Sequence, residues 1–489
     1  MTVSRTTRLT FLVCFVSALY FLTRAGNLGR DLASEEAVFL MPGRFLLEGR
    51  GYYFDWGVFD PHSNAFHKPP LTSLLLGLFS FIGHDSVAGA RLLPFLVGLG
   101  ACLMPLVTAE SSVPSLLVLM SPFFYGAASH MQTDPTVGLL GYGLACWGIA
   151  RIPRSNAYAQ GLLIVGIVFL WLGKVESAVI MSTVIFVGII WQPSGNRMSL
   201  FKAAALSTAV GVSLLVFVSW ILGRTASLPF NESVANVFQT VTRVTTSTLA
   251  AHASNANAGI HERALLLRYA LDFKVPHLFV LCLVPALVVM ARYRHLWSRQ
   301  RPHAVLLVAA IMPVAAYMAV SYSGDGFPRY FLIAFPPLLM LLGLCLQELS
   351  QTWRILASIL LLGVGAAMMM PQTLQAIHAP GSPTVFRGEE GTRQSALLIA
   401  SLTKPGDLVV GPDNAAYYVR DRRWMVDDSF LPYPALHARA LAMAPELRAV
   451  MFKADQNQGV MGQLIEAIER SGATLYKVGS YEVVVARPH

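Results

Sequence analysis

The sequence predicts a polytopic α-helical membrane protein, and three observations support that fold class. Hydrophobic residues make up 55% of the 489-residue chain and charged residues only 13%, whereas soluble domains carry about 25% charged residues. The mean hydropathy is +0.55. Several apolar runs approach the length of about 20 residues that a helix needs to cross a bilayer. The net charge of +9 therefore indicates cationic loops beside anionic lipid rather than a nucleic-acid partner.

The first apolar run, residues 9–22, follows a basic flank that holds Arg5 and Arg8. No small-x-small cleavage signal follows, so we expect a retained first span with a cytoplasmic start rather than a signal peptide. The strongest cytoplasmic loop under the positive-inside rule is Arg292–Arg301. The other spans that fit this charge pattern are predicted at 86–108, 113–129, 135–150, 158–173, 175–191, 200–222, 275–291, 303–321, 330–346 and 354–371.

Residues 71–82 are apolar, but as a helix they would extend only about 18–21 Å, too short to cross a bilayer. Counting them as a span would also place the basic loop 292–301 outside. We therefore expect this helix to lie at the outer surface or to dip partly into the membrane. About eleven spans remain, an odd number, which puts the C-terminus outside.

The chain divides into a transmembrane domain, residues 1–371, and a polar tail, residues 372–489. Two long outer loops are expected within the first part, at 24–85 and 223–273. The tail predicts a small extracytoplasmic α/β domain. Its helices are expected at 395–402 and 461–470, and its strands at 407–410, 448–452 and 481–486.

No cofactor or metal is expected from the sequence. All five cysteines fall inside apolar segments, which is typical of small buried hydrophobic residues (Cys14, Cys102, Cys146, Cys282 and Cys345). Four histidines of the outer loops could gather a divalent metal, but they do not have the spacing of metal ligands (His62, His67, His252 and His261).

Two groups of charged residues stand out in the first outer loop. Glu35 and Glu36 begin a short amphipathic helix, and Lys68 precedes a Pro-Pro break. The acidic pair could instead complement a helix dipole after an N-cap at Ser34. Likewise, Lys68 could extend its amine to the membrane interface without binding anything.

Three further cations are harder to explain structurally. Arg91, Lys174 and Arg329 each fall near the outer end of a predicted span, against the positive-inside bias. Charges at such positions are costly and usually functional. Asp134 precedes Pro135, a sequence that also suits the start of a helix, so both interpretations stay open for it.

The order of these features resembles that of the GT-C membrane glycosyltransferases. One span and a long outer loop with an acidic pair come first, and the resemblance extends over about residues 10–345. It is most similar to the branch that holds the aminoarabinose-to-lipid A transferases and the protein O-mannosyltransferases. The resemblance rests on these residues and short motifs: Lys68-Pro-Pro-Leu, Gly83, Arg91-Leu92, Thr133-Asp134, Gly173-Lys174 and Pro328-Arg329-Tyr330.

The resemblance implies an inverting enzyme that moves a sugar from a polyprenyl-phosphate carrier to a lipid, glycan or protein. It implies a multi-pass protein of the plasma (inner) membrane whose active site and tail are extracytoplasmic. The catalytic candidates are Glu35, which matches the first acid of the family's Asp-Glu pair, and then Glu36 and Asp31. The substrate-binding candidates are Lys68, His67, Arg91, Asp134, Lys174 and Arg329.

These residue types suit the chemistry. A carboxylate can take the proton of an acceptor hydroxyl as general base, and fixed cations stabilise a phosphate leaving group. A transporter or lipid flippase is the rival class, but no inverted repeat of hydropathy is visible. A membrane-anchored binding protein would leave the acidic first loop unexplained. The sugar and the acceptor, lipid A included, stay open.

Overall fold

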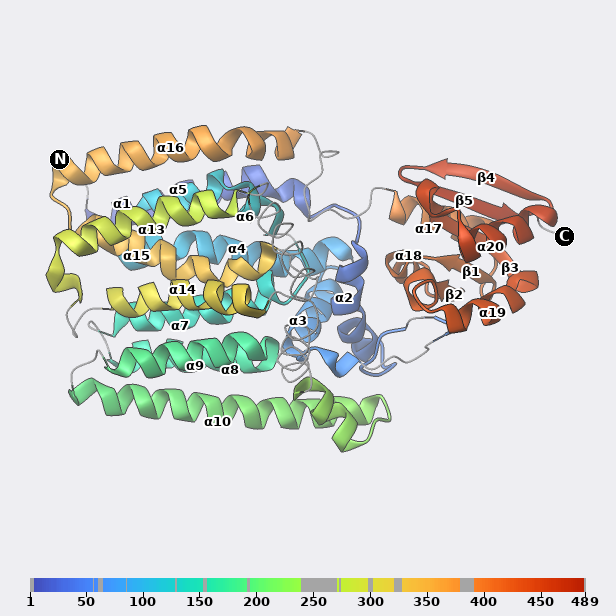
Figure 1. Ribbon diagram of the computed structural model, residues 1–489, viewed down its shortest axis with the longest axis horizontal. Helices are drawn as coiled ribbons and strands as arrows, with labels where there is room; N and C mark the ends of the chain where they lie inside the picture. Colours follow the sequence, from blue (N-terminus) through green and yellow to red (C-terminus); the bar gives the residue numbers. More distant parts are fainter. Residues whose placement is uncertain are drawn as a thin grey trace.

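The computed structural model describes residues 4–487 apart from 56, 60–64, 85, 128–129, 153–155, 191–193, 239–270, 272–273, 298–301, 321–327 and 379–390. The second predicted outer loop, 223–273, thus lies mostly outside the described residues. The side chains of Glu35, His67 and Arg329 also lie outside them, although their backbone is described. Figure 1 shows a bundle of helices with a separate sheet and its helices beyond one end.

The helices of the bundle run roughly side by side (Figure 1). They are α1 Arg5–Arg24, α4 Val87–Ala109, α5 Ser112–Met120, α6 Pro122–Ala127, α7 Leu139–Arg151, α8 Asn156–Gly173, α9 Val175–Ile190, α10 Ser194–Thr225, α13 Val275–Arg292, α14 His303–Val320, α15 Phe335–Gln347 and α16 Gln351–His378. Short helical turns join them, namely η1 Ala25–Asn27, η2 Ala65–His67, η3 Asp134–Gly138, η4 Arg294–Trp297 and η5 Pro328–Ala334.

Five helices among the described residues are long and apolar enough to cross a membrane, which supports a multi-pass membrane protein. They are Arg5–Asn27, Val87–Ala109, Leu200–Thr225, Val275–Arg292 and Gln351–His378, and five shorter apolar helices accompany them. The count of eleven spans stays a prediction. One predicted span, 113–129, is not continuous: it breaks at Ser121, which is extended, because the following Pro122 disfavours a helical conformation there.

Helix α15 lies inside the bundle. Every residue from Phe335 to Leu346 is buried, as expected of a helix that is apolar on all sides. Four of the five cysteines are buried as predicted, but the expectation is wrong for Cys14, which is exposed on α1. In a membrane this side of α1 would face lipid, so an apolar sequence did not require a buried position.

Helices α2 (Ser34–Leu47) and α3 (Leu71–Ile82) pack against each other. They lie at the end of the bundle that faces the sheet (Figure 1). The bounds of α3 coincide with the short apolar helix that the sequence predicts. Helix α2 begins at Ser34, but its N-cap is Ala33, one residue before the N-cap considered from the sequence.

The C-terminal part contains a five-stranded mixed sheet in the order β2-β1-β3-β5-β4. Its strands are β1 Leu408–Gly411, β2 Arg423–Val426, β3 Leu447–Lys453, β4 Ala473–Val478 and β5 Tyr481–Ala486. β1 pairs in parallel with β2 and β3, whereas β5 pairs antiparallel with β3 and β4. The sequence prediction lacked β2 and β4. β2 is only four residues long, and no residue of β4 is fully buried, so neither gives a strong apolar pattern.

Helices cover both faces of this sheet. Along β1, Leu408 and Val410 face one apolar cluster and Val409 faces the other, as the alternation of side chains in a strand requires. The first cluster includes residues of α19 (Pro434–Ala442) and α20 (Gly459–Arg470), and the second includes residues of α17 (Thr392–Leu402) and α18 (Asp413–Tyr418). Helix α18 also packs against α2, so the sheet domain is docked on the first loop.

Candidate active site

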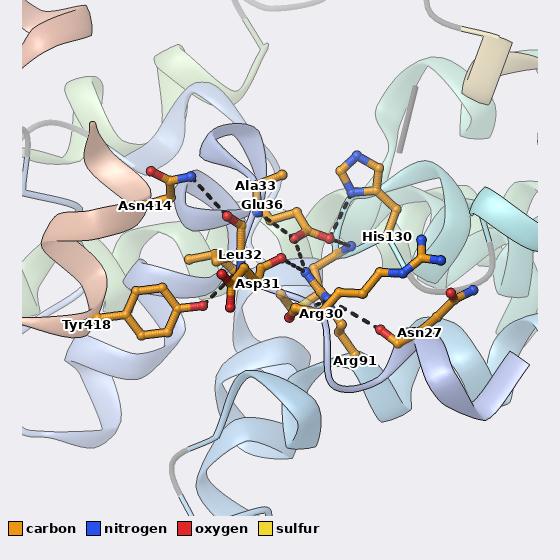
Figure 2. A network of polar contacts seen from close by, with 11 residues as sticks. Asn27, Arg30, Asp31, Leu32, Ala33, Glu36, Arg91, His130, Asn414 and Tyr418 are labelled. Carbon is orange, nitrogen blue, oxygen red and sulfur yellow. Dashed lines mark hydrogen bonds and ion pairs between the residues drawn. The ribbon is translucent and has the colours of Figure 1, made fainter. Parts of the chain in front are cut away.

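Glu36 is the centre of a buried polar network at the start of α2 (Figure 2). Its Oε2 accepts hydrogen bonds from Arg91 Nη2 at 2.6 Å and from the Ala33 amide at 3.0 Å. Its Oε1 lies 3.0 Å from His130 Nδ1 and accepts a hydrogen bond from the Met131 amide at 2.9 Å. Four partners from three segments of the chain therefore surround one carboxylate.

The surroundings of Glu36 keep this carboxylate ionised. Burial alone would raise the pKa of Glu36, but the charges of Arg91 and His130, with hydrogen bonds from His130 and the Ala33 amide, lower it below its usual value. A general base works best when its pKa lies near the working pH. Glu36 is therefore better suited to fix the loop than to take up a proton.

Arg91 holds the backbone of the first loop in place. Nη1 donates to the carbonyl oxygens of Arg30 at 2.7 Å and Asn27 at 3.3 Å. Nη2 donates to the Asp31 carbonyl at 2.6 Å as well as to Glu36. The guanidinium is buried and presents its donors as a rigid fork. It thereby links the first turns of α4 to the segment that leads into α2.

Lys68 lies beside the same helix. Its ammonium is 5.8 Å from the centre of the Phe39 ring, close enough for a cation–π contact. Phe39 comes three residues after Glu36, and residues at this spacing share one face of a helix. A later part of the first loop thus brings a cation to α2.

Asp134 and Lys174 form a second charged pair, with the Lys174 amine bonded to Asp134 Oδ1. Their side chains are 5% and 13% exposed, so the pair is largely removed from water. Gly173 permits this approach because a Cβ there would lie 2.2 Å from Val137 Cγ1. η5, which carries Arg329, packs against η3.

The segment between His130 and Asp134 connects the two charged groups. His130 bonds to Glu36, and Asp134 follows four residues later at the first position of η3. The sequence prediction missed His130. The signal that could have found it is the polar run from His130 to Asp134 between two apolar segments.

The sheet domain also reaches the acidic loop (Figure 2). The Leu32 amide donates to the Tyr418 hydroxyl at 3.0 Å, and the Leu32 carbonyl accepts from Asn414 Nδ2 at 2.9 Å. Asp31 Oδ2 accepts from the Arg393 amide at 3.3 Å. Burial raises the pKa of Tyr418 to about 12, so the phenol stays protonated near neutral pH. No local signal in the sequence predicts these long-range partners.

The structure thus brings Asp31, Glu36, Arg91 and Lys68 together around the start of α2 and pairs Asp134 with Lys174. The side chains of Glu35, His67 and Arg329 are outside the described part, so the prediction that they act in the site stays a prediction. Among the residues that the structure describes, no group of three or more histidine, cysteine, aspartate or glutamate side chains could hold a metal ion.

Comparison with known proteins identifies the fold. No family model matches the sequence, and neither does any curated protein. Two crystal structures of ArnT from Cupriavidus metallidurans are similar over almost the whole chain. The apo structure has a TM-score of 0.63 and 14% identity and covers 98% of this chain and 99% of its own. The structure bound to undecaprenyl phosphate has a TM-score of 0.64 and 15% identity, with coverage of 99% and 100%.

Proposed function

We propose, from this ArnT fold, that the protein is a glycosyltransferase that uses a sugar linked to a polyprenyl phosphate. The observation that carries the proposal is the similarity over nearly the full length, C-terminal sheet included, to an ArnT structure that holds undecaprenyl phosphate. The buried acidic network at the start of α2 supports it, because this loop is where the sequence resemblance expects the catalytic carboxylate. The resemblance to GT-C enzymes is thus confirmed at the level of the fold.

Glu35 is our proposed general base. The acceptor oxygen forms a bond to the anomeric carbon while the bond from that carbon to the carrier phosphate breaks, which inverts the configuration. The acceptor proton passes to the carboxylate, and polyprenyl phosphate leaves with the electron pair. If the acceptor were itself a phosphate, no base would be needed and the carboxylate would orient it instead.

Glu36 is proposed as the anchor of that base. Its two oxygens already accept from Arg91 and from the amides of Ala33 and Met131. A carboxylate held in this way stays charged and fixed. We assign Arg91 the same positioning role, because its terminal nitrogens donate to three backbone carbonyls and to Glu36.

Lys68, Lys174 and Arg329 are the cations proposed to stabilise the carrier phosphate. Lys174 lies opposite Asp134, and such a pair can hold the amine in position until a phosphate approaches. Lys68 lies beside α2, where its ammonium is near the Phe39 ring. We place His67 and Asp31 at the edge of the same site. No metal takes part in this scheme.

The proposed location is the plasma (inner) membrane, with the first loop and the sheet domain on the extracytoplasmic face. The acceptor class there is a lipid such as lipid A, a cell-surface glycan or a protein. The docking of α18 on α2 supports the placement of both parts on one side. Comparing total lipid and glycan masses before and after deletion of the gene would identify the acceptor.

Purified protein incubated with a polyprenyl-phosphate sugar that is radiolabelled in the sugar separates an enzyme from a transporter. An enzyme releases polyprenyl phosphate and labels an acceptor in detergent solution, where no membrane gradient exists. The matched control is Glu35→Gln, which keeps the size of the side chain but cannot take the proton. If the same protein in liposomes moved intact carrier between leaflets without sugar release, the flippase alternative would be favoured.

A further inference from the structure

A charged cavity lies at the opposite end of the bundle from the sheet domain, where the chain begins (Figure 1). Its volume is about 540 Å³, which is in the range of small-molecule sites. Helix α1 contributes Arg5, Arg8, Leu9 and Leu12, a spacing that lies on one helical face. The other walls come from the α4–α5 connection, the end of α15 and the first turns of α16.

The charge of the cavity is positive. Three arginines line it, Arg5, Arg8 and Arg354, against one acid, Glu110. Arg5 is fixed by Glu110, with Nε donating to Oε2 at 3.0 Å and Nη2 bonded to Oε1. Arg354 is fixed by donation from Nη2 to the carbonyls of Gln347 at 2.7 Å and Leu349 at 3.0 Å. Two guanidinium groups are therefore held in place before any ligand arrives.

The walls of the cavity are partly polar and partly apolar. Besides the charged residues, the lining includes Ser111, Ser112 and Ser358. It also includes apolar residues, among them Ile355 and Ile359, one turn apart on α16. These two side chains are 52% and 64% exposed, so they would meet acyl chains in a bilayer.

We propose that this cavity binds the headgroup of an anionic phospholipid, with the phosphate beside Arg8 and Arg354. The acyl chains lie along the apolar part of α1 and α16. Arginine forks bind phosphate oxygens in pairs, and the serine hydroxyls serve a polar headgroup. A free anion would use the arginines but not the apolar wall, which is why we assign a lipid. This site is independent of the proposed glycosyl transfer, because it lies at the other end of the bundle.

The test is native mass spectrometry of the purified full chain with phosphatidylglycerol and, separately, with phosphatidylcholine of the same acyl length. The variants are Arg8→Gln and Arg354→Gln. The control is Arg294→Gln, which removes an exposed arginine from η4, outside the cavity. Phosphatidylglycerol should be retained in preference to phosphatidylcholine. Each cavity variant should lower that retention about fivefold, and the control should leave it unchanged.

Equal retention of the two lipids, or equal retention by Arg8→Gln and the parent, would overturn the proposal. Displacement of phosphatidylglycerol by millimolar inorganic phosphate would also overturn it, because that result identifies a site for free phosphate. If Arg354→Gln fails to fold, Arg8→Gln still decides, since Arg8 is exposed on the first turns of α1.

Discussion

Arg91 and Glu36 are 55 residues apart in the chain, and their side chains meet through a hydrogen bond of 2.6 Å. Both are 3% exposed. The same arginine holds three carbonyls of the segment before α2. The pair therefore connects α4 to the acidic loop, and it divides the two neighbouring glutamates into one that is fixed and one that we propose to react.

The same substitution at the two glutamates should give different losses. Glu35→Gln should reduce turnover by about 10²–10⁴-fold and leave thermal unfolding in detergent unchanged. Glu36→Gln should instead lower stability by about 3–5 kcal/mol, because the charge of Arg91 would then be buried without its partner. Near-normal turnover of Glu35→Gln would show that Glu35 is not the general base. A Glu36→Gln variant as stable as the parent would contradict the anchoring role of Glu36.

The stability that Glu36 contributes should depend on pH in a defined window. Its folded pKa is below the unfolded value of about 4.3. The contribution is therefore complete above the unfolded pKa and is lost as the pH falls through the folded pKa. The difference in thermal stability between the parent and Glu36→Gln should stay constant from about pH 8 to 5 and shrink below about pH 4. If the difference in thermal stability between the two proteins grew on acidification, the pKa of Glu36 would not be lowered in the folded state.

Asp134 and Lys174 should behave as a coupled pair. Lys174→Met removes the cation that is bonded to the buried Asp134 carboxylate and should cost about 3–5 kcal/mol, whereas the double variant Asp134→Asn, Lys174→Met should recover much of that loss. Turnover should stay low in the double variant if Lys174 stabilises the carrier phosphate. Thermal unfolding and turnover, measured on the same preparations, separate the two effects. If the double variant recovered turnover together with stability, the pair would have a structural role only.

Docking of the sheet on the first loop should depend on Gly57, whose φ is +78°. The Val58 amide donates to the Trp424 carbonyl at 2.8 Å, and a Cβ on Gly57 would lie 1.9 Å from that oxygen. The matched control is Gly49→Ala, where φ is +74° and no heavy atom lies within 4 Å. Gly57→Ala should lower stability by about 1–3 kcal/mol more than the control and speed limited proteolysis near the sheet. Equal behaviour of the two variants would mean that this contact does not hold the domain.

The two ends of the bundle should be on opposite sides of the membrane. In a protein with Cys14→Ala, which leaves only the buried cysteines, we would introduce Glu469→Cys in α20 and Gln351→Cys at the start of α16. Both positions are exposed. An impermeant thiol reagent added to cells with a permeabilised outer membrane should label the first and spare the second. The opposite pattern would place the sheet domain in the cytoplasm.

Local signals explain how much of this molecule could be predicted from its sequence. Apolar length gives α4, α13 and α3 with bounds correct to about one residue, because hydropathy is a property of neighbouring residues. Those signals fail where local and global preferences differ. Pro122 interrupts a predicted span. Strand β4 could not be predicted, because it has no alternation of buried apolar residues.

By itself, the sequence determined the membrane class, the positions of most helices and the charged residues placed against the positive-inside bias. It could not decide which acid is anchored, since Glu35 and Glu36 are equivalent as sequence. The tertiary structure decided this for Glu36, because Arg91, His130 and the Met131 amide converge on it from distant segments. Only folding brings Asn414 and Tyr418 to Leu32. Hydrogen bonds of this kind depend on the distance and angle between groups, and these are fixed by the packing of whole helices rather than by adjacent residues.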